Sequence, residues 1–447
     1  MHSKDTIVAP STPHGYGGLA VVRMSGDGAL RVANKLLPKT NTTPLINRFA
    51  TTLLVVTPDG DPLDDVVVTL FSGPNSYTGE DIIEISCHGS PAIVSSLVSF
   101  CVEYGCRIAD PGEFTRRAYI NGKLDLVQAE SVASLIHSRS LDAAKLNVRL
   151  VRGSLSNKLV ELRSKLIKAL SLIEFELDVS EDELDEERLN TAFSLLVSVR
   201  EIFSTLLKTY HDGRIITSGA RVVLSGEPNV GKSTLLNALL GKNRAITSDA
   251  PGTTRDTIEA YSVVGGVPVC FVDTAGIRET NNAIESDGVR RSIEEIETSD
   301  FTLRIIDNIS YPVDIINVKT LVVLNKSDLF SQKQLKLFLN KHNNVVSISA
   351  IREQNISLLE NKILSGLLND KFHSADIYLT TSRQNSVIKD CHGGLENILS
   401  SWNVLLATAD VLAFEIRDVI DNLGFLMGPT TPDTVLDKVF NSFCVGK

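Results

Sequence analysis

The sequence predicts a multidomain protein of the α/β plus α class. It should contain an N-terminal mixed α/β domain, a discontinuous helical domain and an inserted α/β domain with a doubly wound, mostly parallel sheet. Its 447 residues are enough for about two to four domains. Near residue 124 the hydrophobic pattern changes from short β-branched runs to a helical period. Between about residues 217 and 372, strand patterns alternate with helical ones, as in doubly wound sheets.

Residues 1–120 are expected to form the N-terminal domain. The runs Thr6–Val8, Gly18–Arg23 and Val66–Phe71 are rich in β-branched residues and alternate with turn-forming clusters, which is typical of strands. The apolar segment Ala92–Cys101 should form a helix packed on the resulting sheet.

The helical domain is expected in two parts, residues 121–216 and 373–447. In the first part, apolar residues recur three or four positions apart, which places them on one face of a long helix. These residues are Leu155, Leu159, Leu162, Leu166, Leu170 and Ile173. Residues 217–372 are expected to form the inserted domain, with strands at 221–225, 268–272, 302–306, 321–324 and 345–348.

Composition excludes several classes of protein. The chain has 44 Lys and Arg against 54 Asp and Glu, a net charge of −10, which argues against a protein that binds polyanions over its whole surface. The six cysteines lack metal-ligand spacing and suit a reducing compartment. The start of the sequence has no signal-peptide pattern, and no stretch of 18 apolar residues is present. We therefore expect a cytoplasmic protein without membrane contact.

A phosphate loop follows the first strand of the inserted domain. Gly226–Ser233 fits the pattern Gly-x-x-x-x-Gly-Lys-Ser and precedes a helical run. Its backbone N–H groups should cradle phosphates, Lys232 should neutralise the β- and γ-phosphates, and the Ser233 hydroxyl should ligate Mg²⁺. By itself this motif does not separate ATP from GTP.

A second motif makes that separation. Asn325-Lys-Ser-Asp328 follows the strand at 321–324, where a base-reading loop should lie. The Asp328 carboxylate can accept both N1–H and the 2-amino group of guanine, a pattern that adenine does not offer. Ser349 and Ala350, after the next strand, should complete the base pocket.

Two further segments complete the nucleotide site. Asp273-Thr-Ala-Gly276 ends a strand, so its acid should hold the Mg²⁺ shell through water and the Gly276 N–H should sense the γ-phosphate. In Gly252–Asp256, Thr254 is the expected second Mg²⁺ ligand. These four segments, in this order, predict a GTPase of the Ras-like P-loop class.

The residue that orients the attacking water is not obvious from these motifs. Many such GTPases place a Gln directly after the Asp-x-x-Gly segment, but Ile277 stands there and cannot hydrogen-bond. Another polar group, a potassium ion or a partner must take that role. The nearest polar candidates are Arg278, Glu279 and Glu285, each of which also fits an ordinary solvated residue.

Over essentially its full length, the chain resembles the MnmE (TrmE) family of tRNA-modification GTPases. The resemblance rests on segments that other GTPases lack, and one of these segments is the loop 252–256. The remaining segments are Asp5–Ala9, Gly73–Asp81, Pro111–Phe114, Asn121–Leu126, Gln128–Glu130 and Phe443–Lys447.

The resemblance implies hydrolysis activated by K⁺ when the G domains of two subunits meet. Glu285 would then orient the water indirectly. The implied K⁺ ligands are Asn229, Ser248, Ala250 and Thr253. The residues expected to bind GTP are Asn229, Val230, Gly231, Lys232, Ser233, Thr234, Ser248, Asp249, Ala250, Pro251, Gly252, Thr253, Thr254, Asp273, Thr274, Ala275, Gly276, Asn325, Lys326, Asp328, Ser349 and Ala350.

The same resemblance implies a folate site in the N-terminal domain and a constitutive homodimer. 5,10-Methylenetetrahydrofolate, or a 5-formyl analogue, would be held by Arg23, Glu80, Lys123 and Lys447. Cys444 would lie beside the folate as a functional thiol. A prenylation signal is the weaker interpretation of the terminal Cys-Val-Gly-Lys, because Gly446 is not aliphatic.

The implied activity is the addition of an aminomethyl-type group to C5 of the wobble uridine of certain tRNAs. An FAD-dependent partner of the MnmG type would carry the flavin and use NADH. The alternative is a regulatory or ribosome-assembly GTPase without modification chemistry, which the four nucleotide motifs fit equally well. A purely structural scaffold does not explain Asn325–Asp328.

Charge along the chain is uneven. Residues 145–168 hold seven basic residues and one acid, whereas residues 174–187 hold nine acids and no base. Both blocks fit solvated helix faces, but the basic one is the first place to look for contact with tRNA. Its members are Lys145, Arg149, Arg152, Lys158, Arg163, Lys165 and Lys168.

Overall fold

The computed structural model describes residues 5–38, 43–179, 186–241, 258–273, 295–311, 319–342, 344–369, 376–406, 408–428, 433–441, 443, 445 and 446. The chain divides into two compact units. The first consists of residues 1–133 with 424–447, and the second of residues 134–423. Each unit is described by itself.

The first unit is built on a six-stranded sheet in the order β3-β4-β5-β2-β1-β6. Neighbouring strands are antiparallel, except that β1 and β6 are parallel. The strands are β1 (Thr6–Pro10), β2 (Gly17–Ser25), β3 (Ala50–Val56), β4 (Pro62–Phe71), β5 (Ile82–Gly89) and β6 (Cys106–Ile108). The expected mixed α/β fold is therefore confirmed.

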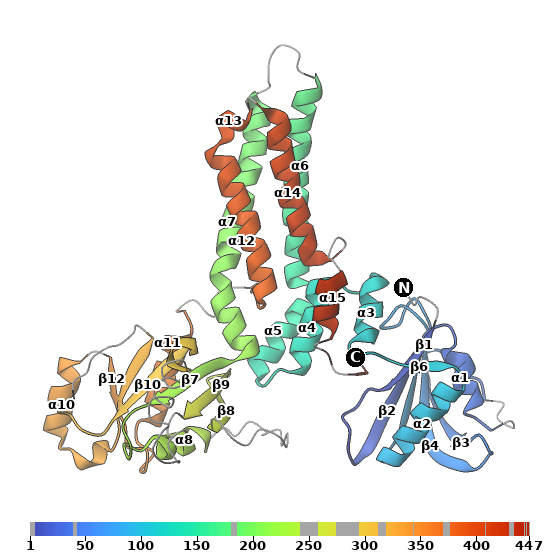
Figure 1. Ribbon diagram of the computed structural model, residues 1–447, viewed down its shortest axis with the longest axis horizontal. Coiled ribbons are helices and arrows are strands. Elements are labelled where there is room, and N and C mark those ends of the chain that lie inside the picture. The colour runs from blue at the N-terminus through green and yellow to red at the C-terminus, as the bar shows by residue number, and fades with distance from the viewer. Residues whose placement is uncertain are drawn as a thin grey trace, which may run out of the picture. The chain divides into compact units, whose positions relative to one another are not determined.

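Two helices, α1 (Ala29–Lys35) and α2 (Pro91–Glu103), lie against one side of this sheet (Figure 1). Val32 of α1 and Leu97 of α2 share a buried core with Val22 and Ile85 of the sheet. The helix expected at Ala92–Cys101 is thus α2, one residue longer at its start and two at its end. On the other face, Ile7 and Ala9 of β1 pack with Phe114 of α3 (Glu113–Ile120).

The C-terminal segment belongs to this first unit. Leu436 and Phe440 of α15 (Asp433–Phe440) share a core with Leu126 of α4 (Leu126–Ile136). Ser11 Oγ donates a hydrogen bond to Gly446 O at 3.1 Å. The last described residues therefore lie beside the loop that follows β1.

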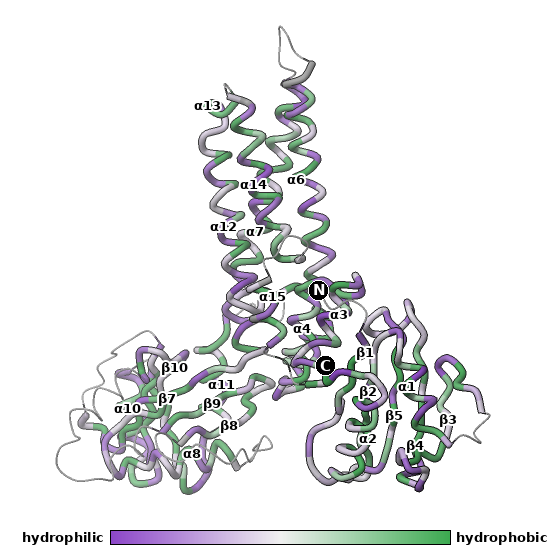
Figure 2. The backbone as a smooth tube through the Cα atoms, turned by 45° about the vertical axis from the view of Figure 1, so that its right-hand side comes forward, coloured by the Kyte–Doolittle hydropathy of each residue, from purple (hydrophilic) through white to green (hydrophobic). Residues whose placement is uncertain are grey.

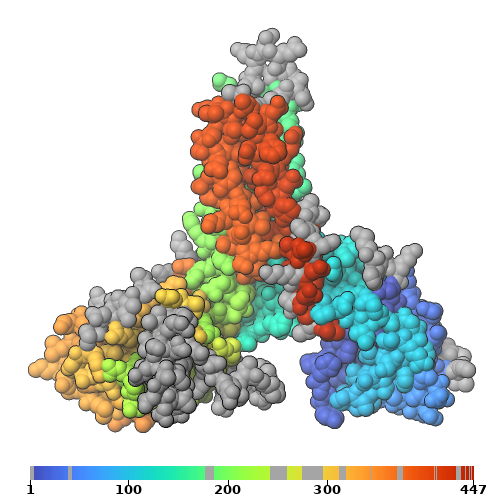
Figure 3. Space-filling view, in the orientation of Figure 1, coloured from blue at the N-terminus to red at the C-terminus, as the bar shows by residue number. Residues whose placement is uncertain are grey.

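The second unit contains a helical bundle. Its helices α6 (Ser154–Val179), α7 (Glu186–Ser218), α12 (Ser382–Ser400) and α14 (Ala409–Met427) run side by side, with α5 (Leu141–Val151) and α13 (Trp402–Leu406) at their ends (Figures 1 and 2). In the space-filling view α12 and α14 form one face of the bundle (Figure 3). The predicted apolar face of α6 is confirmed, except that Leu170 is half-buried and Ala169 takes its place in the core.

The inserted domain follows α7 directly. Its sheet has the order β12-β11-β10-β7-β9-β8, parallel except for the β8–β9 hairpin. The strands are β7 (Ala220–Ser225), β8 (Ile258–Val264), β9 (Val267–Asp273), β10 (Phe301–Ile306), β11 (Thr320–Leu324) and β12 (Val345–Ser347). All five predicted strands are present, and β8 is an additional strand joined to β9 through Gly265 and Gly266.

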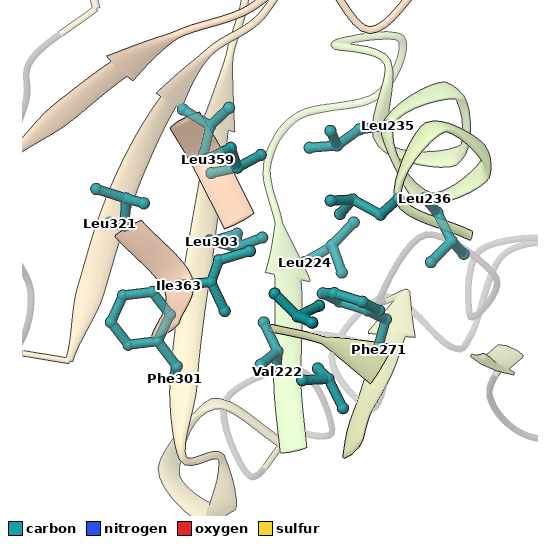
Figure 4. Close-up of a cluster of buried hydrophobic side chains, with 14 of the residues drawn as sticks. Val222, Leu224, Leu235, Leu236, Phe271, Phe301, Leu303, Leu321, Leu359 and Ile363 are labelled. Atoms are coloured by element: carbon teal, nitrogen blue, oxygen red, sulfur yellow. The ribbon is translucent and has the colours of Figure 1, made fainter. Parts of the chain in front are cut away.

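Helices cover both faces of this sheet. Alternate residues of the parallel strands, such as Leu224 and Leu303, pack against Leu235 of α8 (Lys232–Leu240) and Ile363 of α11 (Ile356–Leu367) (Figure 4). On the opposite face, Val322 packs with Phe338 of α10 (Gln332–Lys341). This is the doubly wound arrangement, in which ligands bind at the carboxyl ends of the strands.

No helix in the part of the chain that the structure describes is both long enough and apolar enough to cross a membrane.

Candidate functional site

The phosphate loop connects β7 to α8, and two glycines make its path possible. Gly226 has φ 152°, and a Cβ there would lie 2.4 Å from Ile305 O. Gly231 has φ 94°, and a Cβ there would lie 2.3 Å from Asn325 Nδ2. Only glycine accepts both the backbone conformation and the close approach. The loop is therefore tied to the ends of β10 and β11 by packing.

Lys232 and Ser233 stand at the start of α8, as the motif predicts. Lys232 is 6% exposed, and its Nζ donates to Gly226 O and Glu227 O, both at 2.8 Å. The lysine therefore spans the loop, with its charge at the phosphate-binding concavity. Ser233 Oγ lies 3.3 Å from Asp273 Oδ2 at the end of β9. These two oxygens form a pair of hard ligands of the type that Mg²⁺ prefers.

Asn325 joins the phosphate loop to the base-reading loop. It is 2% exposed; its Nδ2 donates to Val230 O at 2.9 Å, and its Oδ1 accepts from Ala350 N at 3.0 Å. Both halves of the amide therefore bind backbone groups. Asn325 is thus placed to fix the distance between the phosphate and base ends of the site.

Lys326 makes a second connection, through a residue that sequence reasoning missed. Its Nζ donates to Asn229 O at 2.8 Å and pairs with Asp307 Oδ2 at 2.7 Å. Asp307 directly follows β10, and a polar residue at the carboxyl end of a parallel strand is the signal that would have identified it. Tyr311, also missed, donates from its hydroxyl to Glu227 Oε2 at 2.7 Å.

Asp328 lies in the short 3₁₀ helix η2 (Ser327–Leu329), beside Ser349. Ser349 Oγ donates to Asp328 Oδ1 at 2.6 Å, and this hydrogen bond lowers the pKa of the Asp328 carboxyl. An ionised carboxylate accepts hydrogen bonds only, as recognition of the guanine N–H groups requires. Arg352 Nε, 3.5 Å from Asp328 Oδ2, is a neighbour that no motif indicated.

Several predicted site residues lie outside the described residues. They are Ser248, Asp249, Ala250, Pro251, Gly252, Thr253, Thr254, Thr274, Ala275, Gly276, Glu285, Cys444 and Lys447. Asn229, Val230 and Thr234 are described; Asn229 has a left-handed backbone with φ 64°, and Val230 is 3% exposed and packs into the core.

Three of the predicted folate ligands, Arg23, Glu80 and Lys123, are described in the first unit, and each has different neighbours. Glu80 accepts hydrogen bonds from Ser25 Oγ at 2.7 Å and from Arg117 NH1 at 3.1 Å. Arg23 pairs with Glu84 Oε1 through its NH2 at 2.7 Å. Lys123 lines a cavity of about 600 Å³ together with Glu84, whereas Arg23 and Glu80 do not line it.

A network of charged side chains underlies Glu80. Arg117, 8% exposed, binds Glu80, Asp5 Oδ1 at 2.7 Å and Glu113 Oε1 at 3.0 Å. Arg107 binds Asp5 and Glu113 from the other side, at 2.7 and 2.6 Å. Burial raises the pKa of both carboxyls, but hydrogen bonds from the two arginines outweigh burial, so the pKa of each is lowered.

This network predicts acid sensitivity of the first unit. A lowered pKa contributes stability that is present above the unfolded values, 3.8 for Asp5 and 4.5 for Glu113, and is lost as pH falls through the folded ones. We expect the opening free energy of β1 amides to fall by on the order of 1 kcal/mol below about pH 4.5. Native-state hydrogen exchange measures this fall.

Glu113→Gln should flatten that pH dependence, and Asp61→Asn, which removes an exposed carboxyl of the same unit, is the matched control. An unchanged slope in Glu113→Gln would show that the network does not set the acid sensitivity.

The buried cysteines have the chemistry of core residues. Burial raises the pKa of Cys106 to about 11 and that of Cys391 to about 12, so both thiols stay protonated at neutral pH. A protonated thiol is a poor nucleophile. These cysteines are therefore packing residues, and Cys444 remains the candidate functional thiol from the sequence.

The basic block of the bundle does not form one face. At 100° per residue, Lys158, Lys165 and Lys168 fall on one side of α6, and Arg163 falls on the opposite side of its core-facing stripe. Glu161 Oε2 accepts from Lys158 at 2.8 Å and its Oε1 lies 2.9 Å from Lys165. Two of the seven cations are thus already paired with the one acid, which weakens the case for an RNA surface here.

Two family models and full-length relatives match nearly the whole chain. The family model of the GTP-binding protein TrmE N-terminus matches residues 6–123, and that of the MnmE helical domain matches residues 126–444. The tRNA modification GTPase MnmE of Flavobacterium johnsoniae is 37% identical over 100% of both chains. The protein of that name from Pseudothermotoga lettingae is 38% identical over 99% of this chain and 100% of its own.

Among solved structures, the G domain of the T. maritima FeoB iron transporter covers 33% of this chain and 99% of its own, with 20% identity and a TM-score of 0.26. The resemblance noted from the sequence is confirmed by the two family models and by identity over the full length of the relatives. The chain belongs to the MnmE family of tRNA modification GTPases.

Proposed function

We propose that this chain hydrolyses GTP and, with an FAD-dependent partner of the MnmG type, adds an aminomethyl or carboxymethylaminomethyl group to C5 of the wobble uridine, position 34, of certain tRNAs. Family membership supports the tRNA modification. The observation that carries the nucleotide assignment is Asn325, whose buried amide joins the phosphate loop at Val230 O to the base loop at Ala350 N.

Guanine is recognised at the base end of this site. The Asp328 carboxylate accepts N1–H and the 2-amino group, while Ser349 keeps it oriented and ionised. Adenine presents an acceptor at N1 and no 2-amino group, so it would leave the carboxylate unmatched. The Lys326 ammonium group is held at Asn229 O and Asp307, and the aliphatic stem of the residue would then flank the base pocket.

The phosphates bind over the backbone of residues 226–231, with Lys232 at the β- and γ-phosphates. Mg²⁺ would be held by Ser233, with Thr254 as the second ligand and Asp273 bound through water. The 3.3 Å contact between Ser233 and Asp273 fits that role. Bound Mg²⁺ neutralises the charge that develops on the phosphate oxygens.

Hydrolysis uses a potassium ion and a second subunit. Asn229 would ligate K⁺ together with Ser248, Ala250 and Thr253, and Glu285 would orient the water after two G domains meet. The left-handed backbone of Asn229 and the Lys326 bond to its carbonyl hold this residue at the phosphate loop, and both features support the assignment. The cation supplies positive charge between the phosphates, as an arginine finger does.

Potassium dependence can be tested directly. We expect GTP hydrolysis at least about tenfold faster in KCl than in NaCl of equal ionic strength, because loss of a cation of matching size removes stabilisation of the transition state. Phosphate release at steady state measures the two rates. Asn229→Ala should abolish the difference, and equal rates for the unaltered chain in both salts would remove the cation role given to Asn229.

The N-terminal unit supplies the one-carbon group and the homodimer. Folate, as the 5,10-methylene form, would be held by Arg23, Glu80, Lys123 and Lys447, with Cys444 as a thiol beside it. Glu80 is suited to accept from pterin N–H groups, since Ser25 and Arg117 hold its carboxylate in place. FAD and NADH belong to the partner.

The experiment that tests this function is mass analysis of wobble nucleosides in a strain that lacks this chain. We expect unmodified C5 at position 34 and recovery when the chain is restored. Restoration with Cys444→Ser should leave the nucleoside unmodified. Normal nucleosides in the deletion strain would favour a regulatory or ribosome-assembly GTPase instead.

A further inference from the structure

The cavity of the first unit is not fully explained by the predicted folate ligands. Its volume, about 600 Å³, lies in the range typical of small-molecule sites. Of the three predicted ligands that the structure describes, Arg23, Glu80 and Lys123, only Lys123 lines it. The full lining consists of Arg48, Phe71, Asn75, Ser76, Tyr77, Ile82, Glu84 and Lys123.

The charges of the lining favour an anionic ligand. Glu84 is the lining acid, and Arg23 already neutralises it through contacts of 2.9 and 2.7 Å to Oε1. Arg48 and Lys123 contact no carboxylate in the part of the chain that the structure describes. The cavity therefore carries two uncompensated positive charges, which an anion would complement.

Both cations are held at one loop. Lys123 Nζ donates to Pro74 O at 2.9 Å, and Arg48 NH2 donates to Asn75 O, the next carbonyl along the chain. Gly73 N is anchored to Asp81 Oδ1 at 2.9 Å, which fixes the start of the same loop. Lys123 and Arg48 each use one hydrogen-bond donor in their contacts with the loop carbonyls. The remaining donors of the guanidinium fork are available to a ligand oxygen.

Arg48 holds its position at a conformational cost. Its backbone has φ 61°, a left-handed conformation that long side chains rarely adopt. Arg48 N nevertheless donates to Leu70 O at 2.7 Å, and its guanidinium carbon lies 5.7 Å from the centre of the Phe71 ring. A strained residue kept at the rim of a cavity is a common sign of a functional position.

We propose that Arg48 is a further ligand-binding residue, which holds, with Lys123, the carboxylates of the glutamyl tail of a folate. The rings of Phe71 and Tyr77 in the lining offer flat apolar surface to the aromatic part of the same ligand. The apolar side chains that line the cavity beside the two cations suit a carboxylate-bearing molecule with an aromatic part better than a bare phosphate group. This inference rests on the proposed folate function and names the ligand class as glutamylated folates.

The test compares ligands that differ only in the number of carboxylates. The full chain is titrated calorimetrically with 5-formyltetrahydropteroate, 5-formyltetrahydrofolate and its triglutamate. We expect affinity to rise with each step, by about tenfold in total, because charge-assisted hydrogen bonds are added. In Arg48→Gln this gain should shrink to about threefold or less, while affinity for the pteroate changes little.

Arg48→Lys keeps the charge without the fork and should recover part of the gain. Lys35→Gln removes an exposed cation of α1 that does not line the cavity, and should leave the gain unchanged. Circular dichroism establishes that each variant is folded.

An unchanged gain in Arg48→Gln overturns the role of Arg48 and leaves the folate function standing. Failure of the unaltered chain to bind any of the three compounds overturns the folate function itself. Competition by millimolar inorganic phosphate, with no preference for the tail, would mean that the cations hold phosphate, and would also overturn the inference.

Discussion

Replacing Asp328 by Asn should weaken GTP binding by about a thousandfold. The hydrogen bond from N1–H then goes to a neutral acceptor, the 2-amino group loses its acceptor, and an N–H donor faces that amino group instead. The same change should create affinity for xanthosine triphosphate. The Asn amide can accept from N1–H of xanthine and donate to its 2-carbonyl, so complementarity is restored with the opposite polarity at C2. Nucleotide titration and phosphate release with the two triphosphates measure both effects.

The matched control for this exchange is Glu353→Gln. Glu353 is an exposed carboxylate four residues after Ser349, and its removal changes net charge by the same amount. It should leave the preference for GTP intact. Persistence of tight GTP binding in Asp328→Asn, with no gain for xanthosine triphosphate, would mean that guanine is not read by Asp328.

The fold was predictable where the sequence carries a regular period. The apolar face of α6 and the strands of the inserted domain follow directly from spacing, since a helix repeats every 3.6 residues and buried parallel strands form continuous apolar runs. β8 was missed because its register is set by pairing with β9 through the turn at Gly265 and Gly266. Residues of β8 become buried because the strand pairs with β9. The sequence of β8 alone has no hydrophobic period that would indicate a strand.

The nucleotide site was predictable as a set of motifs but not as a set of contacts. Gly226, Lys232 and Asp328 are recognisable from their spacing. Asp307 and Arg352 are not, because they belong to no motif and approach Lys326 and Asp328 only after three parallel strands bring their carboxyl ends together. Such neighbours depend on the order of strands in the sheet, which no short segment of the sequence determines.

The N-terminal site had the weakest sequence signal of all. Arg117, Glu84 and Arg48 are ordinary charged residues in the sequence. Their roles come from contacts that only the fold creates, such as those with Glu80, Arg23 and Asn75 O respectively. A surface arginine and a cavity-lining arginine look alike until the burial and charge of their neighbours are known. This is why the ligand class inferred from Arg48 needed the structure.

Asn325→Ala should give a large loss of stability in the inserted domain. It leaves Val230 O and Ala350 N buried without their partners, at about 1–3 kcal/mol each, so we expect the free energy of unfolding to fall by roughly 2–6 kcal/mol. Asn308→Ala, at an exposed position of the same domain, is the control and should cost less than about 1 kcal/mol. Urea unfolding followed by circular dichroism compares the two.

The same variant separates two roles of Asn325. If the amide only stabilises the fold, bound GTP should restore stability to the extent that it does in the unaltered chain. If it fixes the spacing between the phosphate and base loops, saturating GTP should restore less, because the ligand must now order both loops itself. We expect the second result, since the amide contacts one backbone group from each loop and is hidden from solvent. Equal stabilisation by GTP in both chains would limit Asn325 to a structural role. Asp328 would then account for guanine binding and Lys232 for phosphate binding without a contribution from Asn325.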